Sequence, residues 1–190
     1  MLSQVLYREL TSADTVLDIP PEFTMRVATR NDLVQAQPDW PKGALETELI
    51  DAALARGDLC IAAFAGEKLL AMVWRSFSVA PHSDLVDIHV EKPYWYTYKM
   101  MTLPQARGTG LGGLLTVVCD RLCQDSGCVG GVGFVETHNY SSLRANAKVG
   151  AKRVGYAGIV QVCGKAYPFR TSGVRPFTFQ FVARTRMQKS

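Results

Sequence analysis

Four glycines within six residues, 108–113, constrain the fold of this chain more than any other feature. A strand pattern precedes them, and a helix pattern with apolar residues three and four apart follows from 111 to 124. Each glycine inside a helix costs about 1 kcal/mol relative to alanine. A simple connection would need one left-handed residue, so this many glycines favour a backbone that approaches a ligand closely. The alternative is a glycine-rich connection without a ligand.

Backbone amides at the start of such a helix attract anions. They lack partners inside the helix and lie at the positive end of its dipole, so three or four of them can hold a pyrophosphate without a lysine. Arg107 adds a fixed positive charge directly before the first glycine. The segment therefore predicts a site for a cofactor that carries phosphate groups.

Residues 108–113 also match the GxGxxG pattern of dinucleotide-binding folds. Glu136 ends the next predicted strand about 20 residues further on, where such folds place the acid that binds a ribose. A Rossmann-like oxidoreductase is therefore an alternative, although that fold normally opens with this unit and repeats it, whereas here four strands come first. The GxxxxGK motif of nucleoside triphosphatases is absent.

The rest of the chain alternates between strand and helix patterns. A strand is expected at Thr24–Ala28, followed by helices from Arg30 and over 44–56. The later elements are a hairpin over 59–79, two strand segments within 85–103 that Pro93 separates, a strand at 129–135, a helix at 139–149, and strands at 152–162 and 177–183.

This order predicts an α/β fold of the α+β kind, with a mixed, mostly antiparallel sheet of about seven strands and about four flanking helices. The two strands around the glycine helix should be parallel, because a right-handed crossover joins them. The sequence shows neither an internal repeat nor an interdomain linker. Residues 1–190 are therefore expected to form a single domain, with 1–23 as an N-terminal extension.

Composition argues against several classes of protein. The net charge of +4 comes from scattered basic residues rather than a stripe, so no nucleic acid is expected as a partner. The sequence has neither an export signal nor an apolar run of roughly 20 residues, which predicts a cytoplasmic protein without a membrane partner. Its five cysteines should then be free thiols. Cys119, Cys123 and Cys128 lie close together, but no CxxC or HxxxH pair accompanies them, so no metal site is predicted.

The glycine segment resembles the Gcn5-related N-acetyltransferase (GNAT) family. That family's signature, (Gln or Arg)-x-x-Gly-x-(Gly or Ala), is met by Arg107, Gly110 and Gly112. A second family motif, Asn-x-x-(Ala or Ser) leading to Lys-x-Gly, is met by Asn139, Ser142, Lys148 and Gly150. The order of elements agrees as well, and the resemblance covers residues 24–183.

The resemblance implies acyl-coenzyme A as the co-substrate, without a metal. Backbone groups of Met101 and Leu103 would bind the pantetheine chain, along a strand that a β-bulge splits from its neighbour. Asn139 and Ser142 would contribute from the second motif. The pyrophosphate would lie on the turn formed by Arg107, Gly108, Thr109, Gly110, Leu111 and Gly112.

One position departs from the family. Many members carry a tyrosine that protonates the departing thiolate, and Asn146 stands at the matching position. An asparagine cannot act as that acid, although its amide could donate a hydrogen bond to the sulfur. Family variants without the tyrosine often have a serine where Ser142 stands, so Ser142 is a candidate contact for the thiol. A plain helix-capping role for Ser142 is the alternative.

Tyr98 is our candidate for the general base, because it lies near the expected strand split. Ordinary strand packing is the alternative for Tyr98 and its aromatic neighbours. A second feature is the segment 164–176, which could fold over the acceptor and offer Arg170 and Arg175 to a carboxylate. The other groups available as a base are Tyr96, Glu91, His89, Glu136 and His138.

Together these features predict an N-acetyltransferase that passes the acetyl group of acetyl-CoA to a primary amine by direct attack in a ternary complex. The acceptor would be a small molecule or a peptide. A catalytically degenerate acyl-CoA-binding module is the alternative. The acceptor, the acyl chain length, acyl-carrier-protein use, the base and the oligomeric state are not readable from these motifs, and a homodimer is compatible with them.

Overall fold

The computed structural model describes residues 1–10, 18–83, 86–163 and 165–184. The chain divides into two compact units. Unit 1 contains residues 1–9, 77–96 and the chain from Val129 on, and unit 2 contains residues 10–76 and 97–128. Strand β7 (Tyr94–Thr102) supplies residues to both units.

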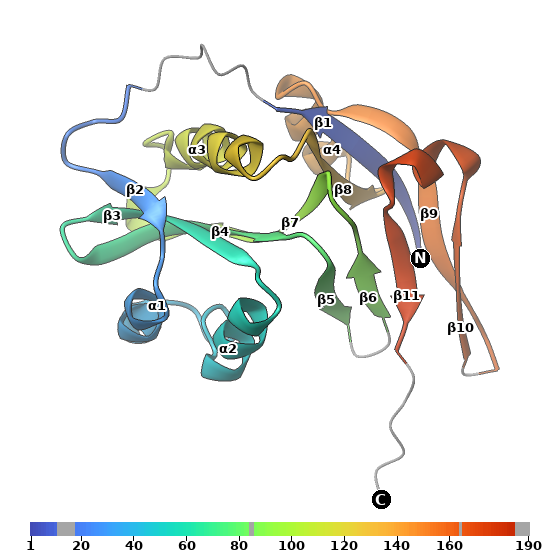
Figure 1. Cartoon of the computed structure of the whole chain (residues 1–190), viewed down its shortest axis with the longest axis horizontal. Coiled ribbons are helices and arrows are strands. Elements are labelled where there is room, and N and C mark those ends of the chain that lie inside the picture. Colours follow the sequence, from blue (N-terminus) through green and yellow to red (C-terminus); the bar gives the residue numbers. More distant parts are fainter. Residues whose placement is uncertain (11–17, 84–85, 164, 185–190) are drawn as a thin grey trace, which may run out of the picture. The chain divides into compact units, whose positions relative to one another are not determined.

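Unit 2 has a layer of helix on each face of its strands. The strands are β2 (Thr24–Val27), β3 (Leu59–Ala65), β4 (Lys68–Ser76) and the second half of β7. β3 and β4 form the predicted antiparallel hairpin. Helix α3 covers one face of these strands and helices α1 and α2 the other (Figure 1). The helices span Leu111–Asp125 (α3), Arg30–Ala36 (α1) and Thr47–Ala55 (α2), and the 3-10 turns η1 and η2 span Gln37–Asp39 and Pro104–Ala106.

Alternation along β3 and β4 builds the core beneath α3. Side chains two residues apart on a strand point to the same face. One such set on β3 and β4 packs against apolar residues that recur along one side of α3. The set comprises Ile61, Ala63, Ala71 and Val73, and its partners on α3 are Leu111, Leu115 and Cys119.

Helix α1 begins where the sequence predicts, because a capping box fixes its start. Thr29 Oγ1 accepts a hydrogen bond from the amide of Asp32, and the Asp32 carboxylate accepts one from the amide of Thr29. Arg26 donates two further hydrogen bonds to the same carboxylate, at 2.6 and 2.8 Å. These contacts, with the Arg26 bond as the largest cause, hold the pKa of Asp32 well below its usual range.

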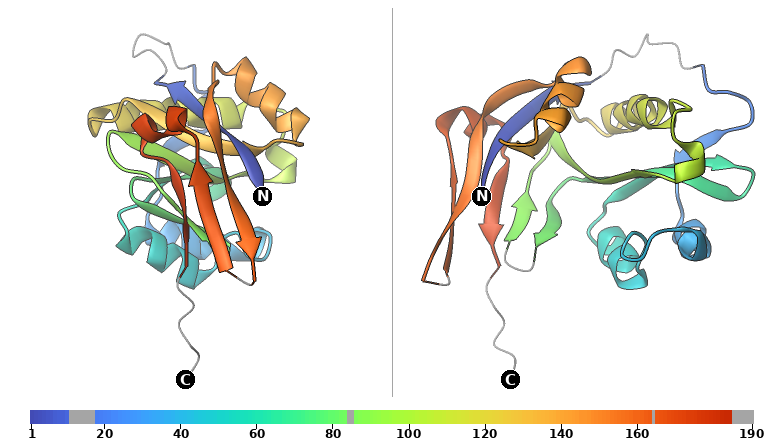
Figure 2. Two further views of the ribbon diagram at one scale, coloured as in Figure 1. Left: turned by 90° about the vertical axis from the view of Figure 1, so that its right-hand side faces the viewer. Right: turned by 180° about the vertical axis from the view of Figure 1, so that it is seen from behind.

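Unit 1 is centred on β1 (Leu2–Glu9), which lies between β8 (Gly130–Glu136) and β9 (Lys152–Val162) and runs antiparallel to both. β10 (Lys165–Arg170) pairs with the far side of β9, and β7 pairs with β8 in parallel over residues Tyr94–Tyr96. Figure 2 shows the long β9 with β10 beside it. A second sheet contains β5 (Val79–Ser83), β6 (Val86–His89) and β11 (Gln180–Ala183). Helix α4 spans Tyr140–Lys148, and the 3-10 turn η3 spans Ser172–Phe177.

The predicted fold class is confirmed. Most strand pairs are antiparallel, and the pair joined through α3 is parallel, as the crossover rule requires. The Rossmann-like alternative is wrong, because a doubly wound fold needs a mostly parallel sheet. None of the described helices is both long enough and apolar enough to cross a membrane.

Three local expectations were wrong. Residues 2–9 were assigned to an extension, but they form β1 inside the sheet. The sequence predicts no strand within the segment 164–176, but residues 165–170 form β10. Pro168 is tolerated there because an edge strand does not need every amide for its ladder. The final strand starts at Gln180 rather than 177, because η3 occupies residues 172–177.

Candidate functional site

The turn between β7 and α3, residues 107–112, has the backbone that its glycines suggested. Gly108 and Gly110 have φ of 81° and 80°, in the left-handed region that side chains disfavour. A Cβ at either position would meet nothing within 4 Å. The requirement for glycine is therefore conformational at these two residues. We call residues 107–112 the glycine turn.

The glycine turn leaves amide donors at the start of α3. Gly110 is the N-cap residue, and no side chain caps the helix. Its carbonyl accepts hydrogen bonds from the amides of Gly113 and Leu114, while the amides before them have no partner within a helix of this register. Thr109 Oγ1 donates to the carbonyl of Ala106 at 2.7 Å, which braces the turn from behind. Residues 107–110, which lead into these donors, are exposed, and a helix start of this kind suits an anion.

Two contacts join the glycine turn to the end of β7. The Arg107 Nε donates to the carbonyl of Thr102 at 3.4 Å, and the exposed guanidinium stays beside the turn. A Cβ added to Gly112 would lie 3.3 Å from Met100 Cε, so a glycine there permits close packing of the helix against the strand.

Leu103 is less available than the resemblance implied. Its amide donates to the carbonyl of Leu70 at 2.9 Å, and its carbonyl accepts from the amide of Ala106 at 2.9 Å. Only the second lone pair of that carbonyl is left for a ligand. The Leu103 amide is therefore already used, and the pantetheine contacts of Leu103 and Met101 stay predictions.

β7 is distorted at Lys99, which has φ of 48° in the middle of the strand. Left-handed backbone is unusual for a residue with a side chain and lies here where the resemblance places a bulge. The Lys99 ammonium donates to the carbonyl of Gly43 at 2.6 Å. The distorted strand is thereby tied to the loop between η1 and α2.

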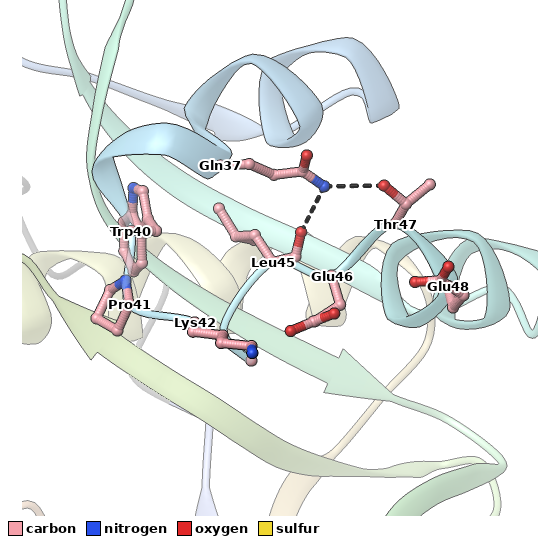
Figure 3. A pocket seen from close by; sticks show the side chains of 9 residues that line it. Gln37, Trp40, Pro41, Lys42, Leu45, Glu46, Thr47 and Glu48 are labelled. Atoms are coloured by element: carbon pink, nitrogen blue, oxygen red, sulfur yellow. Dashed lines mark hydrogen bonds between the residues drawn. The ribbon is translucent and has the colours of Figure 1, made fainter.

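That loop borders a cavity of about 250 Å³. The Gln37 amide donates to the carbonyl of Leu45 and to Thr47 Oγ1, at 2.7 and 3.0 Å, and holds the loop against η1 (Figure 3). The lining combines apolar and charged groups, with two carboxylates and one ammonium. Its residues are Gln37, Trp40, Pro41, Lys42, Gly43, Leu45, Glu46, Thr47 and Glu48.

Tyr98, the candidate base, is buried and hydrogen-bonded. Its hydroxyl donates to Asp58 Oδ2 at 2.7 Å, and its ring stacks on Trp74 with centroids 6.0 Å apart. The same Asp58 oxygen accepts from Arg56 Nη2 at 2.8 Å. Burial, reinforced by the bond to Asp58, raises the pKa of Tyr98 far above its usual range, so its neutral form dominates. Sequence reasoning missed Asp58, because an acid directly before an apolar run such as Leu59–Ala65 is usually exposed, whereas Asp58 is buried.

The second family motif forms the start of α4 in unit 1. Asn139 is the N-cap, and its side-chain oxygen accepts from the amide of Ser142 at 3.1 Å. Asn146 Nδ2 donates to the carbonyl of Ser142 at 2.9 Å and approaches its hydroxyl at 3.5 Å. The capping role considered for Ser142 is therefore wrong, because Asn139 caps the helix. The thiol contacts expected from Ser142 and Asn146 stay predictions.

Other expected residues have local partners. His138 Nε2 lies 3.2 Å from Glu136 Oε2 on the exposed surface. Arg170 Nη1 donates to the carbonyls of Thr178 and Phe179, at 3.4 and 3.0 Å, and so ties β10 to the segment before β11. This guanidinium contributes to the packing of unit 1, which argues against a bidentate grip on a substrate carboxylate.

Comparison of the sequence with protein-family models and with curated proteins finds no match. Among solved structures, the fold matches a protein of Novosphingobium aromaticivorans that is assigned to the GNAT family, with a TM-score of 0.53 and 14% identity over 82% of this chain and 62% of that one. It also matches an aminoglycoside 6'-N-acetyltransferase of Acinetobacter haemolyticus, with a TM-score of 0.52 and 15% identity over 75% and 98% of the two chains.

A Drosophila protein gives a TM-score of 0.52 at 19% identity over 80% of this chain. This chain spans 48% of the Drosophila protein. At these identities the likeness concerns the fold: the chain has the fold of the GNAT acetyltransferases.

Proposed function

We propose that this chain, with its GNAT fold, transfers the acetyl group of acetyl-CoA to a primary amine in the cytoplasm. The observation that carries the proposal is the glycine turn, with its two left-handed glycines, its exposed residues 107–110 and the uncapped start of α3. Amides held in this way fit a pyrophosphate, and the Arg107 guanidinium adds a positive charge beside them.

The chain's own groups suggest how the reactants would be held. The backbone of β7 at Met101 would bind the pantetheine and, through its amide, polarise the thioester carbonyl. The nearby cavity would take the acceptor. Lys99, on the same strand as Met101, donates a hydrogen bond to Gly43, which lines this cavity. Its carboxylates, Glu46 and Glu48, favour a ligand with a cationic group over an anionic one. Proximity and orientation would supply much of the rate.

Calorimetry with acetyl-CoA tests the cofactor site directly. Arg107→Glu should weaken binding by about 10- to 100-fold, because a hydrogen bond to a charged group contributes about 1.5–3 kcal/mol. Lys165→Glu is the matched control, since it makes the same charge change on an exposed residue of β10. Wild-type protein that binds neither CoA nor acetyl-CoA would refute the proposal.

Release of free thiol from acetyl-CoA tests turnover. The panel should include 1,4-diaminobutane, n-butylamine and 4-aminobutanoate, which share a four-carbon chain and differ in the charge at its far end. We expect turnover, with the diamine favoured. Saturable binding without turnover for any amine would instead support a degenerate acyl-CoA-binding module.

A further inference from the structure

Asp58, which belongs to neither family motif, accepts a hydrogen bond from Tyr98, the candidate base. The Asp58 side chain is fully buried between α2 and β3. Its Oδ2 accepts three hydrogen bonds, from Tyr98 Oη at 2.7 Å and from Arg56 Nη2 and Nε at 2.8 and 3.2 Å. Its Oδ1 has no hydrogen-bond partner within the described part of the chain. A buried carboxylate is costly even when paired, so stability alone is a weak reason for this arrangement.

The position of Tyr98 on β7 connects this group to the proposed reaction. Tyr98 directly precedes Lys99, the left-handed residue whose ammonium holds Gly43 at the cavity. Met101 follows Tyr98 by three residues, which is about 10 Å along a strand. Tyr98 is therefore next in sequence to the residue that contacts the cavity, and three residues before the proposed thioester position.

Tyr98 cannot serve as a base on its own. Its buried phenol stays protonated, and a phenol that already carries its proton can take another only if it passes the first one on. In the structure, Asp58 Oδ2 accepts a hydrogen bond from this phenol. The hydrogen bond of 2.7 Å has the length typical of an O–H···O contact.

We propose that Asp58 accepts the proton that leaves the amine, with Tyr98 as the relay. This inference rests on the proposed acetyltransferase function. As the C–N bond forms, the N–H proton passes to Tyr98 Oη, and the Tyr98 proton passes to Asp58 Oδ2. The C–S bond then breaks, and the thiolate takes a proton from solvent. No phenolate forms, and the Arg56 guanidinium donates a hydrogen bond to Asp58 Oδ2 at 2.8 Å.

Asp58 acts through Tyr98 and is thus a positioning and proton-accepting residue, while Tyr98 contacts the acceptor. Asp58→Asn and Tyr98→Phe should each lower kcat by about 100-fold or more, the usual range for a lost general base. The KM for acetyl-CoA should stay unchanged, because neither side chain belongs to the glycine turn. The double variant should be no slower than the slower single variant, because the two groups act as one unit.

Matched controls separate chemistry from structure. Asp51→Asn removes an Arg-paired carboxylate from α2, the helix that precedes Asp58, and Tyr156→Phe removes a hydroxyl that accepts a hydrogen bond from Arg153. Both should keep the wild-type kcat. Urea denaturation of every variant shows which of them fold, and Tyr98→Phe tests the relay even if Asp58→Asn does not fold.

The assay uses acetyl-CoA with whichever of the three panel amines turns over fastest. Wild-type kcat in Tyr98→Phe, or losses that multiply in the double variant, would overturn the relay while leaving the acetyltransferase proposal intact. If the wild type releases no thiol with any of the amines, the proposed function itself fails.

Discussion

Substitution of Gly110 by alanine separates the conformational demand of the glycine turn from crowding. A Cβ at Gly110 meets nothing within 4 Å, so the cost comes from φ of 80° alone, about 1–2 kcal/mol for an L-residue in the left-handed region. Gly113 lies three residues further, inside α3, and a Cβ there also meets nothing. Gly113→Ala should instead stabilise the protein, by up to about 1 kcal/mol, through helix propensity.

The two alanine variants should therefore differ by about 2 kcal/mol, or roughly 4–8 °C in Tm for a chain of this size. Calorimetry should show acetyl-CoA binding at least about 10-fold weaker in Gly110→Ala, because relief of the strain moves the amide donors, and a lost hydrogen bond to a charged group is worth about 1.5–3 kcal/mol. Gly113→Ala should bind as the wild type does. Equal Tm values for the two variants would refute the conformational reasoning, and equal affinities would refute the phosphate site.

Three further predictions concern stability and reactivity. Burial raises the pKa of Tyr98 above the usual 10.0, so its stabilising contribution is complete below pH 10 and is lost as pH rises beyond it; urea denaturation should show a shallower alkaline decline in Tyr98→Phe. Cys163 is exposed and the other four cysteines are buried, so a thiol reagent should modify one thiol rapidly, and Cys163→Ser should abolish that phase. Thr29→Ala removes the cap of α1 and should lower the free energy of unfolding by about 1 kcal/mol; an unchanged urea midpoint would contradict this.

Local patterns explain why much of the fold was predictable. The hairpin of β3 and β4, the capped start of α1 and the long α3 each depend on residues close together in sequence. β1 was missed because its partners, β8 and β9, lie more than 100 residues away along the chain. β10 was missed because Pro168 normally argues against a strand, and nothing local shows that this strand lies at a sheet edge.

The candidate site divides in the same way. The glycine turn is a contiguous motif, so its conformation and exposure could be read from the sequence. The hydrogen bond between Asp58 and Tyr98 joins residues 40 apart, and it depends on the order of β3, β4 and β7 in the sheet. The partner of a candidate base is therefore a property of tertiary structure, and residue spacing alone offers no means of finding it.

Lys99 shows how the two parts of the proposed site depend on each other. Left-handed backbone costs a lysine about 1–3 kcal/mol, whereas glycine would adopt it freely. The side chain must then contribute something that glycine could not, and its hydrogen bond to the Gly43 carbonyl at 2.6 Å is that contribution. The bond fixes Gly43, at the edge of the cavity, to β7. On this strand Tyr98 precedes the left-handed residue and Met101 follows it. The hydrogen bond that accompanies the strained backbone of Lys99 thus fixes the proposed acceptor cavity relative to the strand that carries the proposed proton relay and thioester contact.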